Sequence, residues 1–428
     1  MPFSSPIDIP TNLSVLVIGY VWPEPNSSAA GSHMLSLLRL FKNQSWDVTF
    51  ASPAQETDHM SDLKLEGIQS LSITLNDSSF DRHISELNPD IVMFDRFMME
   101  EQFGWRVEKN CPNALRILDT EDLQCLRNAR HQAIKKNRPM ELSDLYSDLA
   151  KREIAAIYRS DLSLIISSYE IDLLQHQFSM PMQQIYHLPF MLDLEELPTK
   201  LADFDSRKNL MMIGNFRHAP NWDSVLQMQT LWPEIKEKLK DKGYPDVELH
   251  IYGSYPPPKA TALHNPKTGF HIKGWANNAY DVISNARLCL APLRFGAGIK
   301  GKLLDAMVCR TPSITTEIGA EGMTADEHWP GEIAKDNSSF IQATVDHYTD
   351  KYLWDRKQRF SSEILNNHYD GNKTGPRLIQ HIIQLKQDLP SHRLENFTGA
   401  MLNHHSMKST QYMSQWIEAK NKLENSSE

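Results

Sequence analysis

Residues 291–322 read APLRFGAGIKGKLLDAMVCRTPSITTEIGAEG and are the most informative stretch of the chain. A glycine-rich loop with three basic side chains runs directly into a helical pattern, and a second turn carrying Glu321 follows an apolar segment. Glycines let backbone amides approach a ligand, and a helix start adds unpaired N–H groups and the positive end of a dipole. Basic side chains at such a helix start suit a phosphate or diphosphate group. The stretch therefore predicts a nucleotide-binding site.

The length and composition around this stretch indicate a globular protein of two domains. The chain has 428 residues, of which 40% are hydrophobic and 23% charged, and this length exceeds one ordinary core. No apolar run is long enough to span a bilayer, and the start, MPFSSPIDIPTNLS, lacks the features of a secretory signal. The four cysteines are scattered without a Cys-x-x-Cys pair, which indicates free thiols rather than disulfides or a zinc site. We therefore expect a cytoplasmic protein.

The charge distribution points to a small anionic ligand. The formal net charge is −10, and residues 1–200 hold 28 acidic and 17 basic side chains, whereas residues 201–330 hold 14 and 15. An acidic first half argues against nucleic acid and against docking of that whole half on an anionic membrane. A local basic patch leaves peripheral membrane contact open, and the oligomeric state is not indicated.

Apolar strands alternate with helical patterns along most of the chain. The first half contains the strand patterns SVLVIGY (14–20), WDVTFAS (46–52), PDIVMFD (89–95), ALRILD (114–119) and LSLIISS (162–168). The second half contains NLMMIGNF (209–216), VELHIYGS (247–254), FHIKGWA (270–276), ARLCLAPL (286–293) and TPSITTE (311–317). Such alternation predicts parallel sheets covered by helices on both faces.

This pattern predicts an α/β protein of two doubly wound, Rossmann-like domains that face each other across a cleft. Residues 1–190 form the first domain, a Pro-rich and charged linker covers 191–208, and residues 209–375 form the second domain. The helical segment 376–428 can return to the first domain. Ligands of such sheets bind at the carboxyl ends of the strands, so the cleft is the expected site.

Four segments in order resemble the nucleotide-sugar half of glycosyltransferase family 4. They are GNFRHAPNWD (214–223), HIYGS (250–254), HIKGWANNAYDVISNARLCLAPL (271–293), and the glycine loop with its following turn. In the first half, AAGSH (29–33) is similar to the Gly-Gly turn of that family, and ALRILDTEDL (114–123) lies where the family has an acceptor-side strand. The resemblance implies the GT-B fold and a retaining, hexosyltransferase-like enzyme that uses a nucleotide-sugar donor. It further implies a glycan or small hydroxyl acceptor, no cofactor and no catalytic metal, in a setting such as polysaccharide biosynthesis.

The resemblance also implies a donor site in the second domain. Glu321 would hold hydroxyls of the donor sugar, Asp305 the ribose, and the basic groups of the glycine loop the diphosphate. The complete predicted donor set is Gly214, Asn215, Arg217, Arg294, Gly298, Ile299, Lys300, Lys302 and Asp305. Two features depart from the family. Its Glu-x(7)-Glu pair falls on Ala297 and Asp305, and its Arg/Lys pair falls on Asn215 and Pro220.

The candidate acceptor side lies in the first domain. Asp119, Glu121 and Asp122 follow a strand and either start a helix or bind the acceptor and assist as a general base. In retaining transferases the donor's own phosphate is the alternative base, so Glu321, Asp119, Glu121 and Asp122 are our catalytic candidates. The acceptor-side candidates are Gly31, His33, Asp95 and Arg96, with simple packing as the alternative for His33.

Other readings of the sequence have less support. The motif DFD (203–205) mimics an Asp-x-Asp metal motif but lies before a strand, and no His-Glu-x-x-His, Gly-x-Ser-x-Gly or Walker motif is present. A non-catalytic GT-B protein that binds a nucleotide or glycan is one alternative, which Ala297 favours. A GT-B epimerase that acts on the nucleotide sugar itself is the other.

Overall fold

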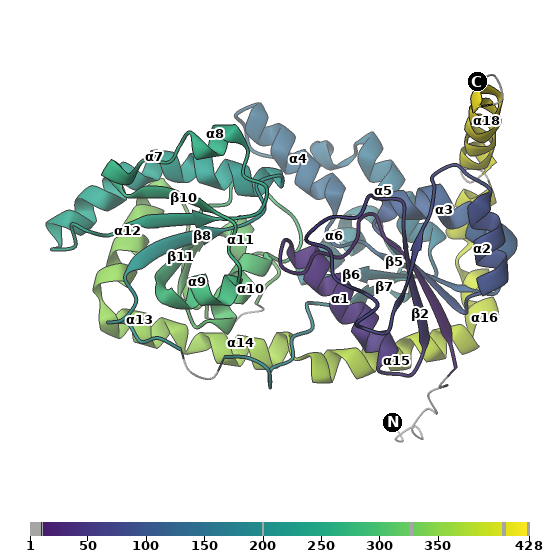
Figure 1. Ribbon diagram of the computed structural model, residues 1–428, viewed down its shortest axis with the longest axis horizontal. Coiled ribbons are helices and arrows are strands. Elements are labelled where there is room, and N and C mark those ends of the chain that lie inside the picture. Colours follow the sequence, from purple (N-terminus) through teal and green to yellow (C-terminus); the bar gives the residue numbers. More distant parts are fainter. Residues whose placement is uncertain (1–9, 11, 199–200, 325–327, 405–407, 426–428) are drawn as a thin grey trace.

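The computed structural model describes residues 10, 12–198, 201–324, 328–404 and 408–425. Two α/β domains lie side by side, each built on its own parallel sheet (Figure 1). This arrangement confirms the predicted fold class. None of the helices in the described part of the chain is long and apolar enough to cross a membrane.

The first domain contains a seven-stranded sheet in the order β3-β2-β1-β4-β5-β6-β7. Its strands are β1 (Ser14–Ile18), β2 (Asp47–Ser52), β3 (Gln69–Ser72), β4 (Ile91–Asp95), β5 (Leu115–Asp119), β6 (Leu162–Ile165) and β7 (Ile185–His187). Its helices are α1 (Ala29–Lys42), α2 (Ser79–Leu87), α3 (Phe97–Asn110), α4 (Gln124–Lys135), α5 (Asp148–Arg159) and α6 (Ser168–Phe178). Every residue of β4 and β5 is buried because apolar clusters cover both faces of the sheet.

The second domain contains a six-stranded sheet in the order β10-β9-β8-β11-β12-β13. Its strands are β8 (Asn209–Ile213), β9 (Leu249–Tyr252), β10 (Phe270–Gly274), β11 (Ala286–Ala291), β12 (Ser313–Thr316) and β13 (Gly331–Ala334). Its helices are α7 (Ala219–Asp241), α8 (Pro258–Thr261), α9 (Ala279–Asn285), α10 (Gly301–Val308), α11 (Glu317–Ala320), α12 (Asn337–Thr349), α13 (Lys351–Gln358) and α14 (Phe360–His368). Helices α7 and α12 cover one face, and α9 and α10 lie on the other.

The chain crosses between the domains twice, and the two crossings pair with each other. The backbone N–H of Leu192 donates to the carbonyl of Tyr369 (2.9 Å), and the N–H of Gly371 donates back to Leu192 (2.9 Å). Helix α15 (Gly371–Gln387) then runs along the first domain (Figure 1), where its apolar side chains join the core of β1 and α1. Helices α16 (Leu389–Glu395), α17 (Phe397–Leu402) and α18 (Lys408–Asn425) follow. The two crossings therefore lie at the same place between the domains.

Candidate active site between the domains

A cavity of about 290 Å³ lies between the two domains. The first domain contributes the loop after β1, the start of α1 and the ends of β4 and β5, and the second domain contributes the ends of β8 and β9. Parallel sheets place ligands at these strand ends, so the cavity is where the topology predicts a site. It is lined by Val21, Trp22, Pro23, Glu24, Ser28, Ala30, Gly31, Met34, Gln55, Thr57, Asp95, Arg96, Glu121, Asn215, Arg217 and Tyr255.

Two buried carboxylates lie side by side at the ends of β4 and β5. Asp95 and Asp119 are register partners, and Oδ2 of Asp95 accepts a hydrogen bond from the N–H of Tyr20 (3.0 Å). Burial, and then the neighbouring charge of Asp95, raise the pKa of Asp119. Oδ1 of Asp95 and Oδ2 of Asp119 have no hydrogen-bond partner among the described residues. Both buried oxygens can therefore accept a further hydrogen bond.

The residues that follow the two carboxylates have strained backbones. Arg96 has a φ of 70° and Glu121 a φ of 62°, which are values that residues other than glycine rarely adopt. Both residues line the cavity. Burial and the charge of Asp119 raise the pKa of Glu121 well above its usual range. Glu121 is therefore the member of the predicted acidic cluster that reaches the cavity. Asp119 lies beneath it, and Asp122 forms an ion pair with Arg127 on α4.

The other two acceptor-side candidates differ in their placement. Gly31 lines the cavity, and a Cβ there would lie 2.4 Å from the carbonyl oxygen of Glu24, so the loop requires a glycine. His33 is buried beside Phe190, with the two ring centroids 5.4 Å apart, and its Nε2 lies 3.9 Å from Oδ1 of Asp119. Burial lowers the pKa of His33 to about 4, so the ring is neutral at physiological pH. The histidine packs behind the site rather than within the cavity.

The turn that carries Glu321 is tied to the first domain. Two guanidinium nitrogens of Arg130 on α4 donate to the two carboxylate oxygens of Glu321, at 2.8 and 2.7 Å. The same guanidinium donates to the carbonyl of Gly296 (2.8 Å) in the glycine loop. The exposed fractions of the two side chains are only 8% and 15%, so water screens this pair weakly. The predicted sugar-binding carboxylate is thus the partner of an arginine from the opposite domain.

A second carboxylate of the first domain reaches the glycine loop. Oε1 of Glu170, at the start of α6, accepts hydrogen bonds from the N–H groups of Gly298 (2.8 Å) and Leu123 (3.0 Å). Burial raises the pKa of Glu170 and lowers that of the nearby Lys300, whose Nζ donates to the carbonyl of Gly298 (2.7 Å). Ile299 completes this contact by packing against Ile166 and Phe190 of the first domain. The glycine loop is therefore in direct contact with the first domain.

Lys302 lies on the donor side with the first loop of the second domain. Its Nζ donates to Oδ1 of Asn221, whose side-chain amide in turn donates to the carbonyl of Asn215 (3.0 Å). A Cβ at Gly214 would lie 2.6 Å from this amide, so the glycine makes room for it. Burial lowers the pKa of Lys302 to about 8. Three of the predicted donor residues, Gly214, Asn215 and Lys302, thus lie close together, and Asn215 lines the cavity.

Three further donor candidates occupy different environments. Arg217 lines the cavity and stacks over the ring of Tyr255, with its guanidinium carbon 3.7 Å from the ring centroid. Asp305 on α10 is half-buried, and burial raises its pKa to about 7. Arg294 is 43% exposed and pairs with Asp223 of α7, with Nε 2.9 Å from a carboxylate oxygen. The structure therefore does not bring Arg294 into the cavity.

Several residues at this interface carry no signal in the sequence. Arg130 and Glu170 lie on ordinary helical patterns, and their targets are on the other domain, so spacing along the chain does not reveal them. Tyr255 donates to the carboxylate of Glu24 (3.2 Å) across the cavity. Trp275 stacks on His59 of the first domain, with ring centroids 4.3 Å apart.

Two parallel-sheet domains enclose a cavity at their strand ends, which is the architecture of the GT-B fold. The family model for glycosyl transferases group 1 matches residues 207–350, which span most of the second domain. The recognition made from the sequence and the expectation of a glycosyltransferase are confirmed by this match. No curated protein matches the sequence.

Solved structures share the fold over most of the chain. Sucrose-phosphate synthase from Thermosynechococcus elongatus has a TM-score of 0.65 at 13% identity and covers 87% of this chain and 99% of its own. Anabaena Alr3699/HepE in complex with UDP and glucose has a TM-score of 0.63 at 9% identity and covers 87% and 100%. A glycosyltransferase from Rickettsia africae ESF-5 has a TM-score of 0.62 at 11% identity and covers 88% and 98%. Likeness at such identities establishes the GT-B architecture of this chain.

Proposed function

We propose that this protein is a cytoplasmic, retaining, metal-independent glycosyltransferase that moves a sugar from a nucleotide-diphosphate sugar to a hydroxyl acceptor. The observation that carries the proposal is the cavity, because both domains line it and its lining combines carboxylates with cations. Glu121, Asp95 and Arg96 face it from the first domain, and Asn215 and Arg217 from the second. The second domain would bind the donor and the first the acceptor.

The donor side has the charge that the reaction needs. As the glycosidic bond breaks, negative charge accumulates on the departing diphosphate, and fixed cations stabilise it. Arg217 lies in the loop after β8, and Lys302 bonds to Asn221 at the start of the helix that follows this loop. Lys300 adds a third cation within the glycine loop. The start of α10 follows at Gly301 and supplies free N–H groups. These groups would supply the positive charge that a metal ion provides in other transferases.

The choice of donor nucleotide follows from the structural neighbours. Alr3699/HepE from Anabaena was solved with UDP and glucose, and one structure of TarM from S. aureus contains UDP and a GlcNAc-glycerol. We therefore take a uridine-diphosphate hexose as the first donor to test on this chain. Trp275 and Tyr255, which follow β10 and β9, are two aromatic groups on the donor side of the interface.

The acceptor hydroxyl must lose a proton during transfer. Glu121 is the carboxylate in the cavity whose raised pKa suits proton uptake, and Asp119 lies directly behind it. Loss of the proton to the departing phosphate is the second route, and it needs no protein base. A Glu121→Gln variant separates the two routes, because only the first predicts a large drop in kcat.

The decisive experiment is transfer by the purified protein from a panel of nucleotide sugars to hydroxyl acceptors. The proposal expects turnover in the presence of EDTA, and NMR of the product should show the anomeric configuration of the donor. Inverted configuration would overturn the retaining assignment, and loss of turnover in EDTA would overturn metal independence. Donor binding without transfer or hydrolysis would establish a binding protein instead, and release of a free epimer without acceptor would establish an epimerase.

A further inference from the structure

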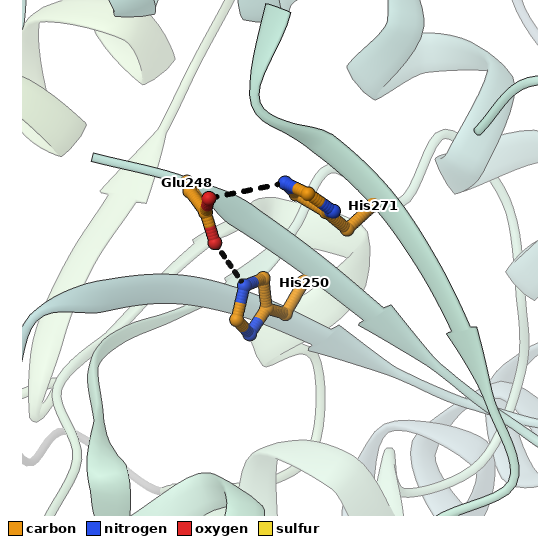
Figure 2. Close-up of side chains that lie close together, drawn as sticks. All are labelled: Glu248, His250 and His271. Atoms are coloured by element: carbon orange, nitrogen blue, oxygen red, sulfur yellow. Dashed lines mark hydrogen bonds and ion pairs between the residues drawn. The ribbon is translucent and has the colours of Figure 1, made fainter. Parts of the chain in front are cut away.

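One carboxylate and two imidazoles meet on the second sheet, outside the proposed active site. Figure 2 shows the side chains of Glu248, His250 and His271 pointing toward one another. His250 on β9 and His271 on β10 are register partners, and Glu248 lies two residues before His250 on the same face. All three stand near the starts of these parallel strands, whereas the cavity lies at the opposite, carboxyl ends.

The distances within this group suit a bound ion. Oε2 of Glu248 lies 2.7 Å from Nε2 of His250, and Oε1 lies 3.3 Å from Nε2 of His271. One ligand atom from each residue can be chosen so that all lie within 4.8 Å of one another. Tetrahedral zinc holds its nitrogen and oxygen ligands at about 2.0–2.2 Å, which places them roughly 3.3–3.5 Å apart. Small side-chain rotations therefore bring the three atoms onto one ion.

The contacts within the group leave one nitrogen unsatisfied. Nε2 of His271 is buried and has no hydrogen bond to any residue that the structure describes, although the carboxylate of Glu248 is close. The side chains of His250 and His271 are only 15% and 12% exposed, so bulk water has little access to this nitrogen. A buried polar atom without a partner costs stability. An ion coordinated by all three side chains would give the nitrogen a partner.

We propose that Glu248, His250 and His271 form a zinc site. Imidazole nitrogen and carboxylate oxygen are ligands that Zn²⁺ takes readily, and three protein ligands leave the fourth position to water. The ion would link β10, at the edge of the sheet, to its single neighbour β9. Trp275 follows directly after β10 and stacks on His59 of the first domain. The ion would thus stabilise the strand that presents this tryptophan, while sugar transfer itself remains independent of the metal.

The proposal is tested by metal binding to the full-length chain without an affinity tag. After removal of bound metal with chelator, titration with Zn²⁺ should give one saturable site, and Co²⁺ should produce the visible absorption of a tetrahedral complex. His250→Gln and His271→Gln keep a polar side chain, and each should weaken binding at least roughly ten-fold, since loss of even an outer partner costs about 10–100-fold. His83→Gln, on α2 of the first domain, is the matched control and should bind zinc normally.

A second measurement distinguishes loss of the zinc site from misfolding of the variants. Zinc should raise the thermal midpoint of the wild type and of His83→Gln but leave that of His271→Gln unchanged, with equal circular dichroism for all three apo proteins. Zinc binding that survives in a His250→Gln/His271→Gln double variant would overturn the proposal. Absence of a saturable site in the wild type would overturn it as well. Neither result bears on the glycosyltransferase activity, which is measured separately in EDTA.

Discussion

The ion pair between Arg130 and Glu321 should hold the two domains together. Arg130→Ala removes two charge-assisted hydrogen bonds to Glu321 and one to the carbonyl of Gly296, and it leaves a carboxylate that is only 15% exposed without its counterion. Breaking a buried pair on one side costs about 3–5 kcal/mol, and the partial exposure here reduces this to about 2–4 kcal/mol. Both domains have their own cores, so the loss falls on domain closure rather than on folding.

Hydrogen exchange at Gly298 measures this closure directly. Its N–H donates to Glu170 of the first domain, so the amide is protected only while the domains are in contact. A shift of about 2–4 kcal/mol predicts exchange that is roughly 30- to 700-fold faster in Arg130→Ala, because each 1.4 kcal/mol is tenfold. Small-angle X-ray scattering should show a larger radius of gyration for the same variant.

The matched control is Arg138→Ala. Arg138 makes a bidentate pair with Asp144, at 2.7 and 2.6 Å, entirely within the first domain. This variant should leave exchange at Gly298 and the radius of gyration unchanged. Equal exchange in Arg130→Ala and wild type would refute the role of the pair in closure, and so would a change of the same size in Arg138→Ala.

Three further predictions concern the interface and the donor side. Gly322 has a φ of 70°, and an added Cβ would lie 2.0 Å from Oγ of Ser167 in the first domain. Gly322→Ala should therefore lower kcat/KM roughly tenfold or more. The control is Gly243→Ala, which has a φ of 90° but open space around the added Cβ, and which should lower only the thermal midpoint. Burial lowers the pKa of Lys302 to about 8, so its amino group is cationic below that pH. The value of kcat/KM for the donor should therefore fall by up to roughly tenfold per pH unit above pH 8. A flat profile up to pH 10 would contradict a role of Lys302 in binding the diphosphate. Burial raises the pKa of Asp305 to about 7, so its contribution lowers the free energy of unfolding as pH rises from about 4 to 7, and the loss is complete above pH 7. Asp305→Asn should therefore raise the free energy of unfolding by about 1–2 kcal/mol at pH 8 in urea titrations, with the gain shrinking as pH falls toward 4. The same variant should weaken donor binding.

The ten strands with strong apolar patterns were predictable from the sequence, and the three others were not. Strands β3, β7 and β13 are short and lie at the edges of the two sheets. The sequence of β3 is QSLS, which is partly exposed and has no apolar run. An edge strand is held by pairing with one neighbour rather than by burial of both faces, so its own residues give a weak signal.

The candidate site could be predicted one domain at a time. Loops after strands identified Gly31, Asp95, Arg96, Asn215 and Arg217, and all five line the cavity. The sequence could not show which groups face each other once the domains close, because those contacts join residues separated by more than a hundred positions. The pairing of Arg130 with Glu321 and of Glu170 with Gly298 depends on this closure. Arg294 was assigned from its place in a basic loop, but Asp223 of the neighbouring helix holds it at the surface.

The surroundings of Ala297 show how contact with the first domain changes the environment of the glycine loop. The family to which this loop is similar has a glutamate there, whereas the side chain of Ala297 packs against apolar residues of the first domain. At the next residue, the N–H of Gly298 donates to Glu170 of the first domain, so a carboxylate reaches the loop from outside. A carboxyl group supplied in this way is in place only while the domains are in contact. The polar surroundings of the donor would therefore be completed by the same movement that excludes water, and an open enzyme would bind the nucleotide sugar without promoting its hydrolysis.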